Sequence, residues 1–379
     1  MLIQIHILQN YAPANLNRDD TGSPKDAIFG GTARGRISSQ CLKRSMRKSA
    51  IFAEAFGGEG KLGMRTKLLP GLIDEELEKL GVEAGERKTI VGRIAEIGRK
   101  AAKAEGGESK EEAEGSTEEA DVGETKQLIF IGRDEIPALV EKAMKLYQEL
   151  GDKNFTKLKI ADLEKKLKHN LPRSVDIAMF GRMTTSEAFE NVQAAVQVAH
   201  AISTNKLVQE FDYYTAVDDL SGQSGAGMIG DVEFNSSTYY KYVNIHWEGL
   251  VENLGGDEEA ARKAVLALIE AAATAQPSGK QNTFAAHNLP DLVLVEVQGR
   301  NLPVSYANAF LKPARASGEE TLMDASVRML GEYMERIVPV YSLEAKRVFA
   351  ATSDYKLAGA ERVKSLAALQ QWVEGELKG

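Results

Sequence analysis

The chain has 379 residues and is 43 % hydrophobic, so it is long enough for two or three structural units with a real core. Its formal net charge is −8, which excludes a protein that is basic throughout, and no run of about 18 apolar residues predicts a membrane-spanning helix. The single cysteine, Cys41, excludes an internal disulfide and favours a reducing compartment, so we expect a cytoplasmic protein.

The chain opens with a strand, a loop and a helix. Residues 2–8 alternate between apolar and polar side chains, which predicts a half-buried strand. A polar loop follows over residues 10–35, and ordered loops of this length are often functional. We expect a helix over 38–56 that ends at the glycine pair 57–58. This order is typical of an α+β domain.

The helix predicted over 38–56 has a basic face. Ser38 or Ser39 can cap it by accepting a hydrogen bond from a free amide of the first turn. The glycine pair 30–31 upstream allows the backbone to approach a ligand closely. Four polar side chains share one face because their spacing is i, i+3, i+4 and i+7: Gln40, Lys43, Arg44 and Arg47.

This basic face stands out from the rest of the chain. Residues 1–50 hold eight Lys and Arg against three Asp, a local charge of +5, so the remainder carries −13. A positive patch on an acidic protein indicates a surface for polyanions, most simply a nucleic-acid backbone. A solvated helix face is the alternative, although residues 36–50 contain no acidic side chain that could pair at i±4.

The next part of the chain has helical patterning around an acidic segment. Residues 73–104 show helical spacing, and residues 105–124 then hold nine Asp and Glu against one Lys. Such a segment cannot bury enough apolar surface to order itself, so we expect a mobile loop. A strand over 127–132 and helices over 134–150 and 154–170 complete a mainly helical insertion.

The middle of the chain predicts a projecting hairpin. Residues 175–183 are expected to form a buried strand, and residues 189–203 a helix whose apolar side includes His200 as a core residue. Aromatic residues then flank a Gly/Ser-rich centre within 204–240, which is typical of a β-hairpin or strap with a flexible tip. A strand is expected over 242–249.

The last part alternates helices and strands. A helix is expected over 257–275, followed by a second polar loop over 274–288 that carries one cation, Lys280. Strands are expected over 291–299 and 304–310, and the final seventy residues are mainly helical.

Common catalytic motifs are absent from this sequence. It contains neither GxxxxGK[ST] nor GxSxG, and its five histidines are too scattered to argue for a zinc site. The pair Asp19 and Asp20 is expected to form a turn or a loop ion pair. Asp218 and Asp219 in the hairpin could hold a divalent ion that cuts RNA. Adjacent side chains on a strand point to opposite faces, however, so only one of these aspartates could reach a bound strand.

Several blocks resemble the CRISPR-associated CasC (Cas seven) family, which supplies the backbone subunit of the type I-E Cascade surveillance complex. The first block is LNRDDTGSPKDAIFGGTARGRISSQCLKRSMRKS. The resemblance continues at VDIAMFGRM, AAVQVAHAIST, FDYYTAVDDL and PSGKQNTFAAHNLPDLVLVEV, so it covers most of the chain.

The resemblance implies an α+β fold shaped like a right hand. A palm with a modified RNA-recognition-motif (ferredoxin-like) core carries a helical fingers insertion and a β-hairpin thumb. The palm would comprise residues 1–59, 171–203 and 243–379. The fingers would comprise 60–170 and the thumb 204–242.

The resemblance also implies a function. Copies of such a protein form a helical filament along one guide RNA (crRNA), hold its phosphate backbone and leave its bases free to pair with target DNA. The implied partners are crRNA, the target DNA strand, further copies of the chain and other Cascade subunits. Neither a membrane nor a cofactor, a metal or a catalytic residue is implied.

The resemblance assigns roles to individual residues. Met179 would pack on bases beside a kink in the RNA, with a buried strand residue as the alternative, and Lys280 would contact a phosphate or a neighbouring subunit. Thumb contacts to RNA or to the next copy would come from Phe211, Tyr213, Tyr214, Asp218 and Asp219. The RNA backbone would be held by Lys25, Ser38, Gln40, Lys43, Arg44 and Arg47.

Two rival functions belong to other classes. The first is a metal-dependent ribonuclease that uses Asp218 or Asp219. The second is an assembly protein whose basic helix binds an acidic partner, such as residues 105–124 of a neighbouring copy.

Overall fold

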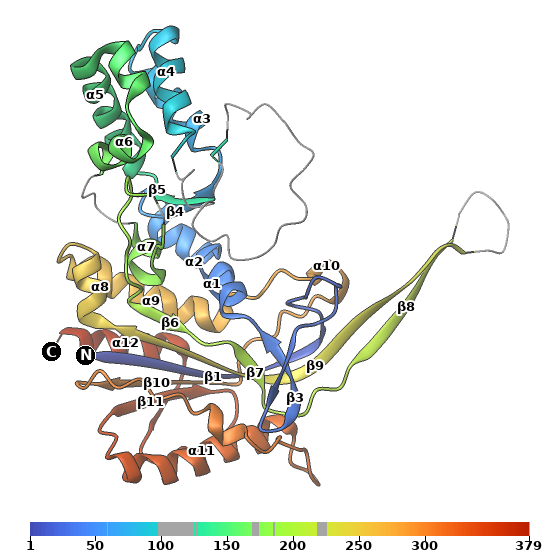
Figure 1. The fold of residues 1–379 in the computed structure, drawn as a ribbon. Helices are drawn as coiled ribbons and strands as arrows, with labels where there is room; N and C mark the ends of the chain where they lie inside the picture. Colours follow the sequence, from blue (N-terminus) through green and yellow to red (C-terminus); the bar gives the residue numbers. More distant parts are fainter. Residues whose placement is uncertain are drawn as a thin grey trace. The chain divides into compact units, whose positions relative to one another are not determined.

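The computed structural model describes residues 1–58, 60–97, 124–125, 128–168, 174–184, 186–217 and 226–378 (Figure 1). They divide into two compact units. The sheet unit comprises Met1–Phe52, Val196–Glu248 and Ala261–Gly379. The helical unit comprises Ala53–Ala195 and Gly249–Ala260.

The sheet unit is built on one large, mostly antiparallel sheet. Its strand order is β12-β11-β10-β1-β9-β7-β3-β2, with β6 and β8 also pairing with β9, and only the β11–β12 pair is parallel among the named pairs. The strands are β1 (Leu2–Ala14), β2 (Asp26–Phe29), β3 (Thr32–Ile37), β6 (Val196–Val198), β7 (Ala201–Ser203), β8 (Glu210–Val217), β9 (Ala226–His246), β10 (Leu292–Gln298), β11 (Lys346–Ala351) and β12 (Glu361–Val363).

Helices cover both faces of this sheet (Figure 1). Helix α11 and the 3₁₀ helix η3 pack on one face in a core that includes Leu8, Leu294 and Phe349. Helices α1, α9 and α12 lie on the other face. The helices are α1 (Ser39–Arg47), α2 (Ala50–Phe52), α8 (Trp247–Asn253), α9 (Glu258–Thr274), α10 (Gln281–Phe284), η3 (Ala307–Phe310), α11 (Leu322–Tyr341) and α12 (Leu366–Lys378); α8 and α9 extend into the helical unit.

Strand β1 is confirmed, but the expectation that it is half-buried is wrong. It pairs with β9 along one edge and with β10 along the other, and helices cover both faces of the sheet, so both of its faces are buried. Gln4 and His6, expected to face water, are at most 1 % exposed. Buried polar groups surround them: Glu296 of β10 accepts hydrogen bonds from Gln4 Nε2 (3.2 Å) and Arg347 Nε (2.6 Å), and His6 Nδ1 lies 2.8 Å from the Tyr240 hydroxyl.

The helical unit combines helices with a small two-stranded sheet. Strands β4 (Gly63–Thr66) and β5 (Ile129–Gly132) pair antiparallel. An apolar core that includes Leu77, Ile94 and Leu139 joins the longer helices. The helical elements are η1, a π-helix (Ala53–Gly57), α3 (Leu69–Lys79), α4 (Ala84–Ile94), α5 (Glu135–Lys157), α6 (Ile160–Leu167) and α7 (Val175–Phe180).

Several predicted elements differ in type. Residues 175–180 form helix α7 where a strand was expected, and the segment VDIAMF is too short for its spacing to distinguish the two. Residues 189–203 form the two short strands β6 and β7, which pair with β9, where a helix was expected. Residues 304–310 contain a 3₁₀ turn instead of a strand. The helix expected over 38–56 is divided into α1, α2 and η1.

The unit boundaries also differ from the predicted domains in three segments. Residues 53–58, the described residues between 174 and 195, and residues 249–260 belong to the helical unit, whereas the predicted palm comprised 1–59, 171–203 and 243–379. All but the last residue of the acidic segment 105–124 lies outside the described residues, so its order stays a prediction. Within the described ranges, no helix combines the length and the apolar character needed to cross a membrane.

Candidate nucleic-acid interface

Helix α1 is fixed at its N-terminus by the loop that precedes it. Ser38 is the N-cap, and its Oγ accepts a hydrogen bond from the backbone amide of Cys41 at 3.3 Å. The Ser38 amide donates to Asn17 Oδ1 at 2.8 Å. Ser38 is 7 % exposed, so its hydroxyl supports the helix from inside and is not displayed to a ligand as predicted.

The predicted basic face of α1 is only partly displayed. Gln40 and Arg44 are exposed and Lys43 is half-buried, but Arg47 is 8 % exposed. Arg47 follows Met46, which belongs to the buried side of the helix, and so it lies next to the core. Lys48 was missed by sequence reasoning and is exposed four residues after Arg44. The i, i+4 spacing from Arg44 is the signal that could have identified it.

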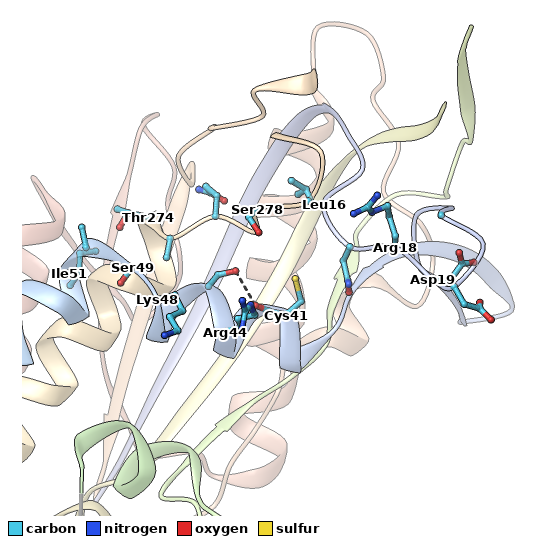
Figure 2. A pocket seen from close by; sticks show the side chains of 18 of the residues that line it. Leu16, Arg18, Asp19, Cys41, Arg44, Lys48, Ser49, Ile51, Thr274 and Ser278 are labelled. Carbon is cyan, nitrogen blue, oxygen red and sulfur yellow. Dashed lines mark hydrogen bonds between the residues drawn. The ribbon is translucent and has the colours of Figure 1, made fainter. Parts of the chain in front are cut away.

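A hollow of about 940 Å³ lies beside this exposed edge of α1 (Figure 2). The loop 16–22, helix α1 and residues 274–279 surround it, and we call it the α1 hollow. Its cations are Arg18, Arg44 and Lys48, and the carboxylates of Asp19 and Asp20 also line it; all five residues are exposed. Hydroxyl groups also line it, from Ser45, Ser49, Thr274 and Ser278.

The two sides of the α1 hollow come from segments far apart in the sequence. Figure 2 shows Arg44 and Lys48 on α1 at one side and Ser278 and Thr274 at the other. Ser45, Ser49 and Thr274 donate their hydroxyl protons to the backbone carbonyls of Cys41, Met46 and Glu270. The cations are thus the groups of the hollow that are suited to phosphate oxygens.

Asp19 forms the turn that the sequence predicted. Its Oδ1 accepts hydrogen bonds from the hydroxyl of Thr21 (2.8 Å) and the amides of Thr21 and Ser23 (3.0 Å each). The hydrogen bond from the Thr21 side chain is the largest cause that lowers the pKa of Asp19. No cluster of three His, Cys, Asp or Glu side chains that could hold a metal occurs in the described ranges.

The charges of Lys25 and Arg44 both influence the Cys41 thiol in the first turns of α1. Burial raises the pKa of the Cys41 thiol, and the positive charges of Lys25 and Arg44 partly offset that rise. The backbone holds Lys25 in place, because its amide donates to the Asn17 carbonyl (2.8 Å) and its carbonyl accepts from the Arg36 amide (2.9 Å). Lys25 and Arg44 therefore both act electrostatically on the Cys41 thiol.

The arginines upstream of α1 have different roles. Arg34 is fully buried, and its guanidinium donates to the backbone carbonyls of Ser203, Thr204, Phe310 and Leu311, so it is a structural anchor. Arg36 is half-buried and donates to the Asp26 carbonyl at 2.8 Å.

His200 lies beside Arg36 and is exposed, so its predicted place in the core is wrong. The prediction failed because residues 189–203 form no helix and hence present no apolar helix face at position 200. Partial desolvation of its ring by neighbouring groups, together with the charges of Arg36 and Lys25, lowers the pKa of His200.

Lys280 follows a glycine that packs on the loop of the α1 hollow. It is half-buried and adopts a left-handed backbone conformation with φ 51° at the N-cap of α10. Its neighbour Gly279 lines the hollow, which brings Lys280 to the edge of the same site. The structure therefore collects Lys25, Gln40, Arg44 and Lys280 in the sheet unit.

In the helical unit, the predicted base contact Met179 is wrong. Met179 is 0 % exposed within α7, which is its buried alternative, although in a helix. Helix α7 ends at Gly181, whose φ is 78°, and Met183 beyond this turn is 96 % exposed. Met183 lines a hollow of about 250 Å³ with Arg65, whose guanidinium lies 5.0 Å from the centre of the Phe130 ring.

The β8–β9 hairpin displays aromatic side chains. Phe211 and Tyr213 share one face of β8 and are 66 % and 64 % exposed. Tyr214, on the opposite face, pairs with Gly230 across the hairpin. Asp218 and Asp219 lie outside the described residues, so their predicted roles stay untested.

Comparisons with known proteins find CRISPR-associated proteins. The family model described as CT1975-like protein, a Cas family, matches residues 3–375. A chain of a solved CRISPR RNA-guided surveillance complex, pre-nicking, is similar with a TM-score of 0.80 and 30 % identity, covering 100 % of both chains. A chain of another CRISPR RNA-guided surveillance complex gives a TM-score of 0.62 and 26 % identity, covering 99 % of each. A search of curated proteins gives no match.

Proposed function

The chain belongs to the CT1975-like family of CRISPR-associated proteins, and we propose that it holds a CRISPR guide RNA as a backbone subunit of a Cascade surveillance complex. Full-length similarity to chains of two RNA-guided complexes supports this class. One observation carries the RNA-binding role: the α1 hollow gathers Arg18, Arg44 and Lys48 on a chain whose net charge is −8.

The α1 hollow is suited to a ribose-phosphate chain and not to a particular base sequence. Arg44 and Lys48 would neutralise phosphates, and Gln40 would donate a hydrogen bond at the exposed start of α1. Contacts of this kind fix the position of the RNA and leave its base edges free. Target DNA could then be read by pairing with the guide, as in other RNA-guided systems.

We assign the sheet unit to the palm, the helical unit to the fingers and the β8–β9 hairpin to the thumb. The exposed aromatic residues Phe211 and Tyr213 would meet the RNA or the next copy of the chain in a filament. In the fingers, Met183 replaces Met179 as the side chain that packs on a base. The blocks that resemble CasC support type I-E as the subtype.

We propose that the chain binds RNA without cutting it. Purification of the protein tests the binding role: RNA should co-purify, and its length should change in regular steps, because each copy covers a fixed length of guide. Protein that is free of RNA and takes up no added RNA would refute the proposal.

A cleavage assay separates the proposal from the ribonuclease alternative. Complementary labelled RNA is added to the filament with Mg²⁺ and should stay intact. Periodic cuts that Asp218→Ala or Asp219→Ala abolishes would instead identify a metal-dependent ribonuclease.

A further inference from the structure

Lys241 is a buried amine inside the sheet unit. It lies on β9 opposite Ile7 of β1, so its side chain is on the sheet face that α1 and α9 cover. It is 3 % exposed, although lysine is almost never fully buried in proteins without a partner of opposite charge.

The surroundings of Lys241 provide no such charge. In the described part of the chain, Lys241 Nζ has one hydrogen-bond acceptor, the neutral Gln9 Oε1 at 2.5 Å. The ammonium also lies 5.5 Å from the centre of the Tyr11 ring. Burial without a counter-charge disfavours the protonated form and lowers the pKa of Lys241 to about 7.

A hydrogen-bonded layer joins Lys241 to the wall of the α1 hollow. Gln9 Nε2 donates to the Asn288 carbonyl at 2.5 Å, and that carbonyl also accepts from Gln276 Nε2 at 2.9 Å. Tyr11 donates from its hydroxyl to Gln276 Oε1 at 2.5 Å. Gln276 lines the α1 hollow, so Lys241 lies one layer behind the surface that would face a bound anion.

We propose that Lys241 takes up a proton when a polyphosphate chain occupies the α1 hollow, so that RNA affinity increases as the pH falls. This inference rests on the proposed RNA-binding function. A nearby negative charge favours the protonated form of a buried amine, because Coulomb attraction is weakly screened there. Linkage is reciprocal: if RNA raises the proton affinity of Lys241, protonation raises the RNA affinity by the same factor.

The other titratable groups around Lys241 do not change charge near neutral pH. Burial raises the pKa of Tyr11 and of Tyr239, which face it from β1 and β9, so both stay neutral. Burial likewise raises the pKa of the Cys41 thiol on α1, and Arg44 on that helix stays charged. Histidines occur nearby at two positions: His200 lies beside Arg36, and His287 adjoins Asn288 of the hydrogen-bonded layer.

The test measures RNA affinity and proton uptake together. Full-length protein is titrated with a uridine-rich single-stranded RNA between about pH 6 and pH 8.5 at constant ionic strength, with Lys241→Met and His200→Gln as variants. If RNA raises the pKa of Lys241 by about one unit, affinity increases up to about tenfold across this range. Lys241→Met should abolish that increase, and His200→Gln should keep it.

Calorimetry in two buffers of different ionisation enthalpy measures how many protons the protein takes up when RNA binds. Wild type and His200→Gln should take up a fraction of a proton per bound site at about pH 7.5, and Lys241→Met should take up none. Proton uptake that disappears in His200→Gln overturns the inference. This measurement does not depend on Lys241→Met, so it remains informative even if that variant folds poorly. Uptake that persists in a folded Lys241→Met also overturns it. Absence of RNA binding at every pH in all proteins would instead refute the proposed function.

Discussion

Gly279 packs directly on Leu16: a Cβ at position 279 would lie 2.3 Å from the Leu16 carbonyl oxygen. This contact joins the 274–279 segment to the loop 16–22 and so forms one corner of the α1 hollow. Real Cβ atoms do not approach backbone this closely, so only glycine allows the two segments to meet.

Gly279→Ala should therefore separate these segments. We expect a loss of about 1–3 kcal/mol in the free energy of unfolding, as for other overpacked sites, together with weaker RNA binding. Chemical denaturation and RNA titration measure the two effects. Gly299→Ala is the control, because a Cβ there meets nothing within 4 Å, and it should change RNA binding little. Equal behaviour of the two variants would contradict the role of this contact.

Met179 and Met183 should behave in opposite ways. Met179→Ala removes a fully buried side chain and should lower the free energy of unfolding by about 2–5 kcal/mol. Met183→Ala removes an exposed one, so it should change stability by less than about 0.5 kcal/mol but weaken RNA binding. Denaturation and filter binding check both. RNA affinity that is unchanged in Met183→Ala would remove this residue from the interface.

The Glu296 carboxylate predicts a pH dependence of stability. Its burial raises its pKa, but the contacts and charges of His6 and Arg347 outweigh burial and hold the pKa at about 2, below the ordinary value of 4.5 for a glutamate. Since the folded state holds the proton less tightly than the unfolded state, the stabilisation is present above about pH 4.5 and is lost as the pH falls through about 2.

Glu296→Gln should consequently cost about 3 kcal/mol at neutral pH, and the difference from wild type should shrink below about pH 4. Urea denaturation at several pH values measures it. Glu374→Gln on α12 is the control, because that carboxylate pairs with Lys378 at the surface. A deficit in Glu296→Gln that stays constant down to pH 2 would show that the carboxylate charge is not the stabilising feature.

The exposed face of the β8–β9 hairpin should serve assembly. Replacing Phe211 and Tyr213 together by Ser should leave the fold intact, since both side chains are exposed, but should shorten filaments on a long RNA. Sedimentation with RNA of several lengths reports the number of copies bound. Leu80→Ser, an exposed apolar side chain in the helical unit, is the control. Filaments of normal length in the hairpin variant would assign assembly to another surface.

Local patterns predicted the regular core elements of the chain. The alternation in β1 and the apolar run in β10 gave strands that the structure confirms, and the helical spacing over 257–275 matches α9. The segments 175–183 and 189–203 were assigned the wrong type. Their apolar residues are too few to distinguish the spacing of a helix from that of a strand. In the segment 189–203, strands form because β6 and β7 pair with β9, and the sequence alone does not show this pairing.

The sequence indicated which segment carries the candidate site, but not which of its side chains reach the surface. Spacing placed Arg44 and Arg47 on one helix face, yet only packing determines that Arg44 is exposed and Arg47 is buried. Lys48 joins the site because residues 274–279 form the other side of the hollow, and nothing local to α1 indicates that arrangement. The burial of Arg34 and Lys241 likewise depends on strands distant in sequence.

The salt dependence of RNA affinity in Arg44→Glu/Lys48→Glu tests the central claim most directly. Its control is Lys356→Glu/Lys364→Glu, which makes the same change in net charge at exposed positions near β11 and β12. We predict that the first variant binds RNA at least tenfold more weakly and that its slope of log affinity against log salt is smaller by about 1.4, because two phosphate contacts are lost. The control should match wild type. Unchanged affinity and slope in Arg44→Glu/Lys48→Glu would contradict the claim that the α1 hollow holds the RNA backbone.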